Sequence, residues 1–552
     1  MSGPPRAGAR RALARVAPLA ASTTRHFPLA GGVLALADRD GLVDALAFGH
    51  ADVARDEPVT LAHLFEIGSI SKLFTSLVID GLVESGRLRH EDPVGEHLAW
   101  AGLSPSLARA RVVELLTHTA GLPLGSDGLA DDAGELWASR AIQAADVDPP
   151  RFHYSNLGYL VLGEVARALT GRRLAELVAD GLLGPLGMTS AVAEIAWDDR
   201  AALATGHWPA RPDRPWVPGD AIAPAAFVET DSAAGNVAAS AADMAALVAA
   251  LLRAAGGESG GPISPETFAR VTTTLAPTGE PTHTPPGTLP VSESRYGLGL
   301  NVERIGESLC VTHGGGMVGH STFLLVDCTL GFGVVVLTNA NGDCLAAHLL
   351  ARAAHAQLVA EASARPSPLP DLDPAVRADL AGAGAFRDDD GEPLEVVAGV
   401  EGAHLTYRGR TGALLATPTG RFVTDHPELR AFHLDFHPGG TWTHGATTFA
   451  PAGATRPAPV WPRPALVGHY RSYSPWYPEF RVVARAGRLW LNAPGGVEAP
   501  DEEVALVEVA PGTYRIGADP WLPERLVAGP VRDGEVVALE RDGLRYSRAF
   551  RG

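Results

Sequence analysis

The sequence predicts an α+β domain followed by two small antiparallel β-barrels. Strand-like runs stand at both ends of a long helical region, which favours an α+β layer. Two proline-rich stretches then divide the second half of the chain, and short alternating runs without a convincing helix follow each of them. At 552 residues the chain exceeds what one hydrophobic core serves, so several domains are expected.

Residues 1–24 predict either an exposed leader or a first amphipathic helix. They are basic and then apolar, as in a secretory signal, but Arg15 and Pro18 interrupt the apolar stretch. We therefore expect a cytoplasmic protein, while the sequence leaves a secreted form and cleavage of the N-terminus open. No run approaches the ~20 apolar residues that span a bilayer, so no membrane partner is expected.

The α+β domain is predicted to span residues 25–362. Residues 31–50 predict two short strands joined by the turn Asp38-Arg39-Asp40-Gly41. The apolar residues after Ser69 recur at helical spacing, and residues 111–117 predict another short helix. Further helices and then strands are expected in order at 157–180, 240–254, 309–312, 321–327 and 332–338. Because strands flank a helical middle, we expect one sheet that pairs N- and C-terminal segments.

Two barrels are predicted after this domain. The proline-rich linkers are residues 363–376 and 453–465, which leaves residues 377–452 and 466–552 for the barrels. The two segments carry the same order of short runs: AFR, LEVV and HLTY in the first, and HYR, FRVV and RLWL in the second. This order predicts two copies of one antiparallel barrel of about 80–90 residues.

Composition narrows the class of partner. A net charge of −18 argues against nucleic acid and anionic membranes, so a small molecule or short peptide is the expected substrate. The three cysteines, Cys310, Cys328 and Cys344, are odd in number and lack C-x-x-C spacing, which argues against a disulfide framework and a zinc site. The sequence predicts no metal and no cofactor.

Lys72 is the most informative residue, because it is the only lysine among 45 basic side chains and the other 44 are arginine. A guanidinium keeps its proton in any protein, whereas a buried ammonium can lose it and become a base. Ser69 precedes Lys72 by three residues, so on a helix both side chains share one face. A hydroxyl beside such an amine is a nucleophile with its activator.

Two more motifs follow in the chain. Tyr154-Ser155-Asn156 stands in a loop that enters a predicted helix, and His313-Gly314-Gly315-Gly316 follows a predicted strand. Each motif is weak alone, since a loop tyrosine is usually a packed ring and a histidine before glycines usually marks a turn. No G-x-x-x-x-G-K loop is present, which argues against a nucleotide site.

Together, the order Ser-x-x-Lys, Tyr-Ser-Asn, His-Gly-Gly resembles the penicillin-recognising serine hydrolases, which include serine β-lactamases, D-alanine carboxypeptidases, D-aminopeptidases and esterases. The resemblance covers about residues 25–360 and implies a β-lactamase-like catalytic domain. Its supporting segments are FEIGSISKLFT at 65–75, GRLRHEDPV at 86–94, ELLTHTAGLP at 114–123, YSNLGYLVLG at 154–163, GPLGM at 184–188 and GVVVLTN at 333–339.

The resemblance implies a role for each motif. Ser69 would be acylated, Lys72 would take or relay its proton, and Tyr154 would act as partner base and acid. Asn156 would hold the lysine and the substrate amide. The backbone N–H groups of Ser69 and Gly316 would form the oxyanion hole.

The remaining two glycines and His313 would bind or support the substrate. Gly314 and Gly315 would leave a strand edge bare for it. His313 replaces the lysine that β-lactamases use to attract a carboxylate, and a mostly neutral histidine is a weaker anchor. Histidine is the form found in D-aminopeptidases, several esterases and peptide-cyclising thioesterases, and the whole architecture looks most like a D-aminopeptidase.

We therefore expect a cofactor-free serine hydrolase, a D-aminopeptidase-like peptidase or amidase, or an esterase. The first alternative is an acyltransferase or macrocyclising thioesterase, in which an amine resolves the same acyl-enzyme. A β-lactamase and a non-catalytic binder are weaker alternatives.

Two further groups of histidines are assigned to structure. His118 is expected to cap or fill the space beneath the site. His433, Asp435 and His437 alternate on a predicted strand, but no fourth metal ligand accompanies them. The role of the barrels is open; they could shield the cleft, restrict substrate length or form a homodimer contact.

Overall fold

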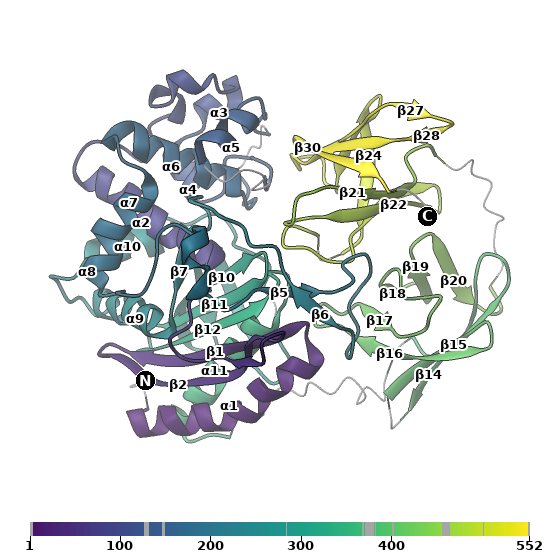
Figure 1. The fold of residues 1–552 in the computed structure, drawn as a ribbon, viewed down its shortest axis with the longest axis horizontal. Helices are drawn as coiled ribbons and strands as arrows, with labels where there is room; N and C mark the ends of the chain where they lie inside the picture. Colours follow the sequence, from purple (N-terminus) through teal and green to yellow (C-terminus); the bar gives the residue numbers. More distant parts are fainter. Residues whose placement is uncertain are drawn as a thin grey trace. The chain divides into compact units, whose positions relative to one another are not determined.

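The computed structural model describes residues 4–549 except 126–131, 146–149, 283, 367–368, 370–379, 381, 400–401, 455–463 and 501. The chain divides into two compact units (Figure 1). One consists of Met1–Trp208 and Ile222–Pro370, and the other of Pro209–Ala221 and Asp371–Gly552.

The first unit is built on one large sheet. Its strands lie in the order β3-β2-β1-β12-β11-β10-β9-β8, and all these neighbours pair antiparallel. The predicted pairing of N- and C-terminal segments is confirmed, because β1 pairs with β12 along most of its length. The strands are β1 (Leu29–Asp38), β2 (Gly41–Asp52), β3 (Glu57–Pro58), β8 (Val291–Tyr296), β9 (Asn301–Ile305), β10 (Ser308–Met317), β11 (His320–Asp327) and β12 (Phe332–Ala340).

Helices cover both faces of this sheet (Figure 1). Helices α1 (Arg6–His26) and α11 (Ala346–Ser363) pack against each other and against one face. Helix α9 (Ala241–Ala255) packs on β1, β2 and β12 from the other face. Strand β1 is buried throughout because it lies between two strands and two helical layers, which explains its nearly continuous apolar sequence.

Along the sequence, a helical region separates the N-terminal strands of the sheet from its C-terminal strands. Helix α2 lies at its centre, and most of its residues are buried. The helices are α2 (Ser71–Glu84), α3 (Pro105–Arg109), α4 (Val112–Leu116), α5 (Asp132–Ser139), α6 (Asn156–Thr170), α7 (Leu174–Val178), α8 (Gly184–Leu186) and α10 (Pro265–Thr273). The shorter elements are η1 (Gly68–Ile70), η2 (Val94–Glu96), η3 (Ala99–Ala101), η4 (Ala179–Leu183), η5 (Trp197–Ala201), β4 (Phe65–Glu66), β5 (His207–Pro209), β6 (Ile222–Pro224) and β7 (Ala238–Ala239).

The second unit contains two closed antiparallel barrels, as the alternating runs predict. The first barrel consists of β13 (Gly384–Arg387), β14 (Pro393–Gly399), β15 (Gly402–Tyr407), β16 (Arg410–Ala416), β17 (Phe422–Thr424), β18 (Leu434–His437), β19 (Thr441–His444) and β20 (Thr447–Pro451). The second consists of β21 (Gly468–Arg471), β22 (Glu479–Arg485), β23 (Arg488–Asn492), β24 (Val504–Ala510), β25 (Thr513–Ile516), β26 (Arg525–Ala528), β29 (Ala538–Arg541) and β30 (Leu544–Arg548). A two-stranded ribbon, β27 (Val531–Arg532) and β28 (Glu535–Val536), is separate from it.

Aromatic side chains fill both barrels. Trp442 and Phe449 are fully buried in the first, and Tyr470, Phe480 and Tyr546 in the second. The three runs that mark the repeat occupy the first three strands of each barrel, in the same order. Each interior is therefore a packed core and not a channel.

The second unit also includes a segment that the sequence did not predict there. Residues 209–221 connect β5 to β6, yet they cluster with the barrels. The Asp220 carboxylate accepts hydrogen bonds from Arg214 at 3.2 Å and from Arg430 at 2.6 Å. A carboxylate with two arginine partners fastens this segment to the first barrel.

The linkers predicted at 363–376 and 453–465 fall mostly on residues outside the described part of the chain, so those boundaries remain predictions. Among the described residues, no helix combines the length and apolarity that a bilayer crossing needs.

Burial in the central sheet predicts how two leucine substitutions change the free energy of unfolding. Leu337 on β12 is fully buried, whereas Leu309 on β10 is 37% exposed. We expect Leu337→Ala to lower the free energy of unfolding of the first unit by about 2–5 kcal/mol, because it leaves a cavity. Leu309→Ala should stay within about 0.5 kcal/mol of the unchanged protein. Urea unfolding of both variants measures this, and equal effects would contradict the assigned core.

Candidate active site

Ser69 lies where the chain turns from β4 into α2. Gly68 adopts a left-handed conformation with φ of 54°, and a Cβ at this position would come within 2.7 Å of the backbone nitrogen of Gly316. Only glycine fits such a turn against a neighbouring strand. The turn leaves Ser69 partly exposed while Lys72, one turn further on, is fully buried.

Lys72 contacts three oxygen atoms with its amine. Nζ lies 3.0 Å from Oγ of Ser69, 2.8 Å from Oδ1 of Asn156 and 2.9 Å from the carbonyl oxygen of Ala234. A neutral amine has two N–H groups and one lone pair. The two carbonyl oxygens can accept both N–H groups, which leaves the lone pair for the hydroxyl proton of Ser69. The arrangement can therefore deprotonate the serine.

The second motif, Tyr154-Ser155-Asn156, places Tyr154 and Asn156 beside the Lys72 amine at the start of α6. Ser155 is the N-cap of this helix, where its Oγ accepts the N–H of Gly158 at 3.2 Å and donates to the carbonyl of Pro123 at 2.6 Å. This cap fixes Asn156 at the start of the helix, and Tyr154 just before it. Nζ of Lys72 lies 5.0 Å from the centroid of the Tyr154 ring. The structure thus brings Ser69, Lys72, Tyr154 and Asn156 together.

His313 lies behind this group and is 1% exposed. Its Nε2 is 2.8 Å from the hydroxyl of Tyr296, and its Nδ1 is 2.5 Å from the carbonyl oxygen of Gly314. The tautomer that satisfies both contacts donates from Nδ1 to Gly314 and accepts the Tyr296 hydroxyl proton at Nε2. Burial lowers the pKa of His313, so the ring stays neutral. This geometry favours the supporting part of its predicted role over an anchor for substrate charge.

The glycines after His313 differ in how closely other atoms pack around them. A Cβ on Gly315 would lie 1.9 Å from the carbonyl oxygen of Ile67 and 2.3 Å from Oγ1 of Thr322, so this glycine is required by packing. A Cβ on Gly314 would meet only Phe323, at 3.8 Å. The pairing of β9 with β10 ends at Thr312, which leaves the glycine segment paired only with β11 among the described strands. An edge next to Ser69 is therefore available.

Two supports of the site are not predicted by the sequence. The chain from Ser232 to Val237 supplies carbonyl oxygens: that of Ala233 accepts from Thr75 at 2.7 Å, and that of Ala234 accepts from Lys72. Tyr296 is the partner of His313. Neither could be found from the sequence, because a backbone acceptor has no residue signature and a single tyrosine in an edge strand is usually a packing residue.

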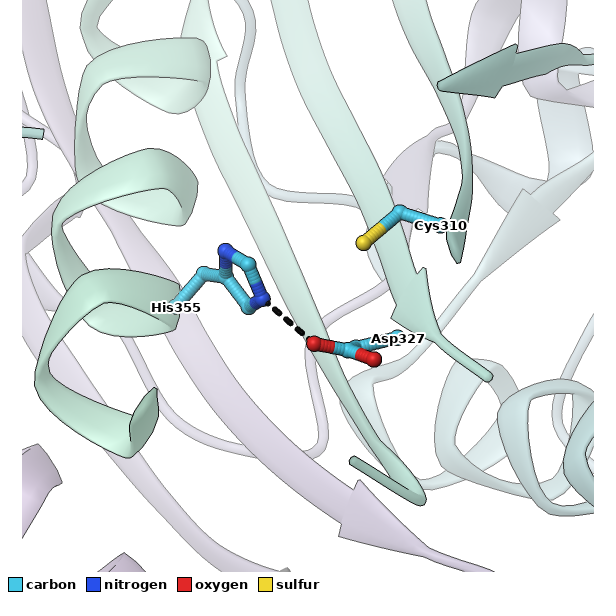
Figure 2. A group of neighbouring side chains, drawn as sticks. All are labelled: Cys310, Asp327 and His355. Atoms are coloured by element: carbon cyan, nitrogen blue, oxygen red, sulfur yellow. Dashed lines mark hydrogen bonds and ion pairs between the residues drawn. The ribbon is translucent and has the colours of Figure 1, made fainter. Parts of the chain in front are cut away.

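Figure 2 shows a separate group of potential metal ligands, Cys310, Asp327 and His355, whose ligand atoms lie within 4.8 Å of one another. Asp327 already accepts hydrogen bonds from His355 at 2.8 Å and from the N–H groups of Thr329 and Leu330 at 2.9 and 2.7 Å. Burial raises the pKa of Cys310, which keeps the thiol protonated. These contacts favour a structural role, in which the Asp327–His355 pair joins α11 to the sheet.

In the first barrel, Asp435 and His437 of the trio that also includes His433 form hydrogen bonds with other residues. Arg421 donates to both carboxylate oxygens of Asp435, at 2.7 and 2.8 Å. Nε2 of His437 lies 2.9 Å from Oγ1 of Thr443. Burial lowers the pKa of His433 to about 3. The assignment of these residues to structure therefore agrees with their contacts.

Comparisons with known proteins agree with the fold of the first unit. The family model named Beta-lactamase matches residues 21–358. Penicillin-binding protein 4 of Amycolatopsis lactamdurans is 32% identical over 174 residues, which cover 30% of this chain and 45% of that protein. The teichoic acid D-alanine hydrolase of Staphylococcus aureus is 28% identical over 151 residues, or 27% of this chain and 37% of that one. The matches thus span less than half of each relative.

One solved structure shares the architecture more broadly. The octameric penicillin-binding protein homologue from Pyrococcus abyssi aligns with 80% of this chain and 99% of its own, with a TM-score of 0.53 and 20% identity. At this level of identity the likeness concerns the fold alone.

The glycines provide a matched test of the site's packing. We expect Gly315→Ala to lower the melting temperature by several degrees, because its methyl group would displace the chain before Ser69. Gly314→Ala should melt within about 1 °C of the unchanged protein, since its methyl group meets open space beside Phe323. Differential scanning calorimetry of both variants measures this. Equal melting temperatures would contradict the close approach.

Proposed function

Because the chain belongs to the Beta-lactamase family, we propose that it is a serine hydrolase that cleaves an amide or ester bond through an acyl-enzyme on Ser69. The observation that carries the proposal is the set of three oxygen contacts around the buried Lys72 amine. Burying a charged ammonium is costly, and a serine nucleophile needs a neutral amine as its base, so we propose that Lys72 is neutral when Oγ of Ser69 attacks.

The proposed reaction begins with attack by Oγ of Ser69 on the substrate carbonyl carbon. The hydroxyl proton passes to Nζ of Lys72 as the new C–O bond forms. When the tetrahedral intermediate collapses, the bond to the leaving group breaks, and the leaving atom takes a proton from the Tyr154 hydroxyl. Lys72 then returns its proton to Tyr154. Water repeats the sequence on the acyl-enzyme, which releases the acid and restores Ser69.

The oxyanion hole is proposed to be the N–H groups of Ser69 and Gly316. Support comes from the contact of the Gly68 backbone with Gly316, which holds η1 and β10 together beside the nucleophile. Such donors lower the barrier by about 3 kcal/mol each in other hydrolases. Because both belong to tightly packed backbone, they would need little reorganisation during the reaction.

We propose a small D-configured acyl group, such as D-alanyl, as the substrate class, carried by a short peptide, amide or ester. The relative named teichoic acid D-alanine hydrolase supports this class. The neutral, buried His313 supports it as well, since a substrate carboxylate would find no cation at that position. For the same reason we expect weak activity on a chromogenic cephalosporin.

The nucleophile and its base can be tested separately. Ser69→Ala should abolish the covalent adduct that a fluorophosphonate forms, as measured by intact mass. Lys72→Arg should lower kcat for a D-alanyl ester by on the order of 10⁴-fold, because a guanidinium keeps its proton. An undiminished adduct in Ser69→Ala, or full turnover in Lys72→Arg, would contradict the proposal.

The fate of the acyl-enzyme distinguishes hydrolysis from acyl transfer. We expect the free acid to remain the main product when a D-amino acid amide is added as acceptor at high concentration. Product ratios by mass spectrometry measure this. A dominant aminolysis product would favour the acyltransferase or macrocyclising thioesterase alternative, which uses the same residues.

A further inference from the structure

His118 occupies an unusual position beneath the site. It is 2% exposed, and its backbone is left-handed with φ of 55°. Residues with a Cβ adopt this conformation at a cost of about 1–2 kcal/mol. A buried histidine that keeps such a backbone needs contacts that outweigh this cost, and the hydrogen bonds that His118 accepts come from the loop that carries Tyr154.

His118 holds the peptide groups on both sides of Tyr154. Its backbone carbonyl accepts the N–H of His153 at 2.7 Å. Its side-chain Nδ1 accepts the N–H of Ser155 at 3.1 Å. Between these two hydrogen bonds, the imidazole lies 4.3 Å from the Tyr154 ring, centroid to centroid, with the planes tilted by 31°. One residue thus fixes the backbone before and after the tyrosine and one face of its ring.

The contact with Ser155 requires a neutral imidazole, because a protonated Nδ1 has no lone pair to accept an N–H. Burial is the main cause that lowers the pKa of His118 well below its usual 6.5. The other rings packed on it belong to Phe152, Tyr159 and Tyr296. His118 therefore remains an acceptor through the neutral pH range.

We propose that His118 is a positioning residue that sets the direction of the Tyr154 hydroxyl for proton transfer to the leaving group. This inference rests on the proposed function, in which Tyr154 supplies that proton. This positioning role predicts different effects of a His118 substitution on two kinds of substrate. An anilide leaving group needs a proton as the C–N bond breaks, whereas a nitrophenolate departs without one.

Two variants of His118 test what Nδ1 contributes as the hydrogen-bond acceptor for the N–H of Ser155. His118→Phe keeps an aromatic ring against Tyr154 but has no acceptor for Ser155. His118→Asn places Oδ1 near the position of Nδ1 and tolerates a left-handed backbone well. Should His118→Phe fail to fold by circular dichroism, His118→Ala replaces it, since alanine adds no bulk.

The experiment compares a D-alanyl p-nitroanilide with a D-alanyl p-nitrophenyl ester. We expect His118→Phe to lower kcat for the anilide at least about tenfold with KM nearly unchanged, because small misplacements of a catalytic group are costly. In kcat/KM, which reports only the steps through acylation, the ester should lose less than about threefold, because its nitrophenolate leaves without a proton. His118→Asn should restore part of the anilide rate. In a Tyr154→Phe background, His118→Phe should cause no further loss, since the residue it positions is gone.

Each contrary result has a distinct meaning. Equal losses on both substrates, or an unchanged anilide rate in a folded His118→Phe, would overturn the positioning role. Additive losses in the double variant would overturn it too. Failure of the unchanged protein to cleave either substrate, or to form a Ser69 adduct, would instead overturn the proposed function.

Discussion

The burial of one amine among three oxygen atoms is the interaction on which the rest of the active site depends. The Lys72 amine lies on α2, but the three oxygen atoms around it come from η1, α6 and the chain around Ala234. Two of these elements are held independently: α6 by the Ser155 cap, and the Ala234 chain by Thr75 and by the N–H of Ile67, which donates to Val237 at 2.9 Å. A buried amine tolerates few other arrangements, because an unpaired polar group in the interior is costly.

Ser69, the proposed nucleophile, is equally constrained by close packing of the backbone around it. Gly68 and Gly315 allow η1 and β10 to approach more closely than any Cβ would permit. Thr322 reinforces the contact by donating to the carbonyl of Ile67 at 3.0 Å. The backbone N–H groups at the site therefore have their directions set by a rigid sheet, which is what preorganised stabilisation of an oxyanion requires.

The sequence predicted the fold where local pattern carries the information. Alternating and continuous apolar runs located β1, β2, β10, β11 and β12 of the sheet and the repeat of the barrels, but not β8 and β9. The single lysine pointed to Ser69 as the proposed nucleophile. The sequence could not reveal that Ala234 supplies an acceptor, since every residue has a carbonyl. Nor could it show that His313 is paired with Tyr296, because that contact depends on which strands become neighbours. The docking of residues 209–221 on the barrel unit was missed for the same reason: Asp220 and Arg430 are 210 residues apart.

The two buried histidines also explain how a proton could follow one route. His118 and His313 lie close to Tyr154, with ring centroids 4.3 and 6.4 Å from its ring, and imidazoles often accept protons in active sites. Here burial lowers the pKa of both, and each uses a ring nitrogen to accept a hydrogen bond, from the Ser155 N–H or the Tyr296 hydroxyl. Neither lone pair is directed at Ser69. In the proposed reaction, the Lys72 amine is therefore a better acceptor for the Ser69 proton than either histidine, and arginine in its place would close this route because a guanidinium has no lone pair to offer.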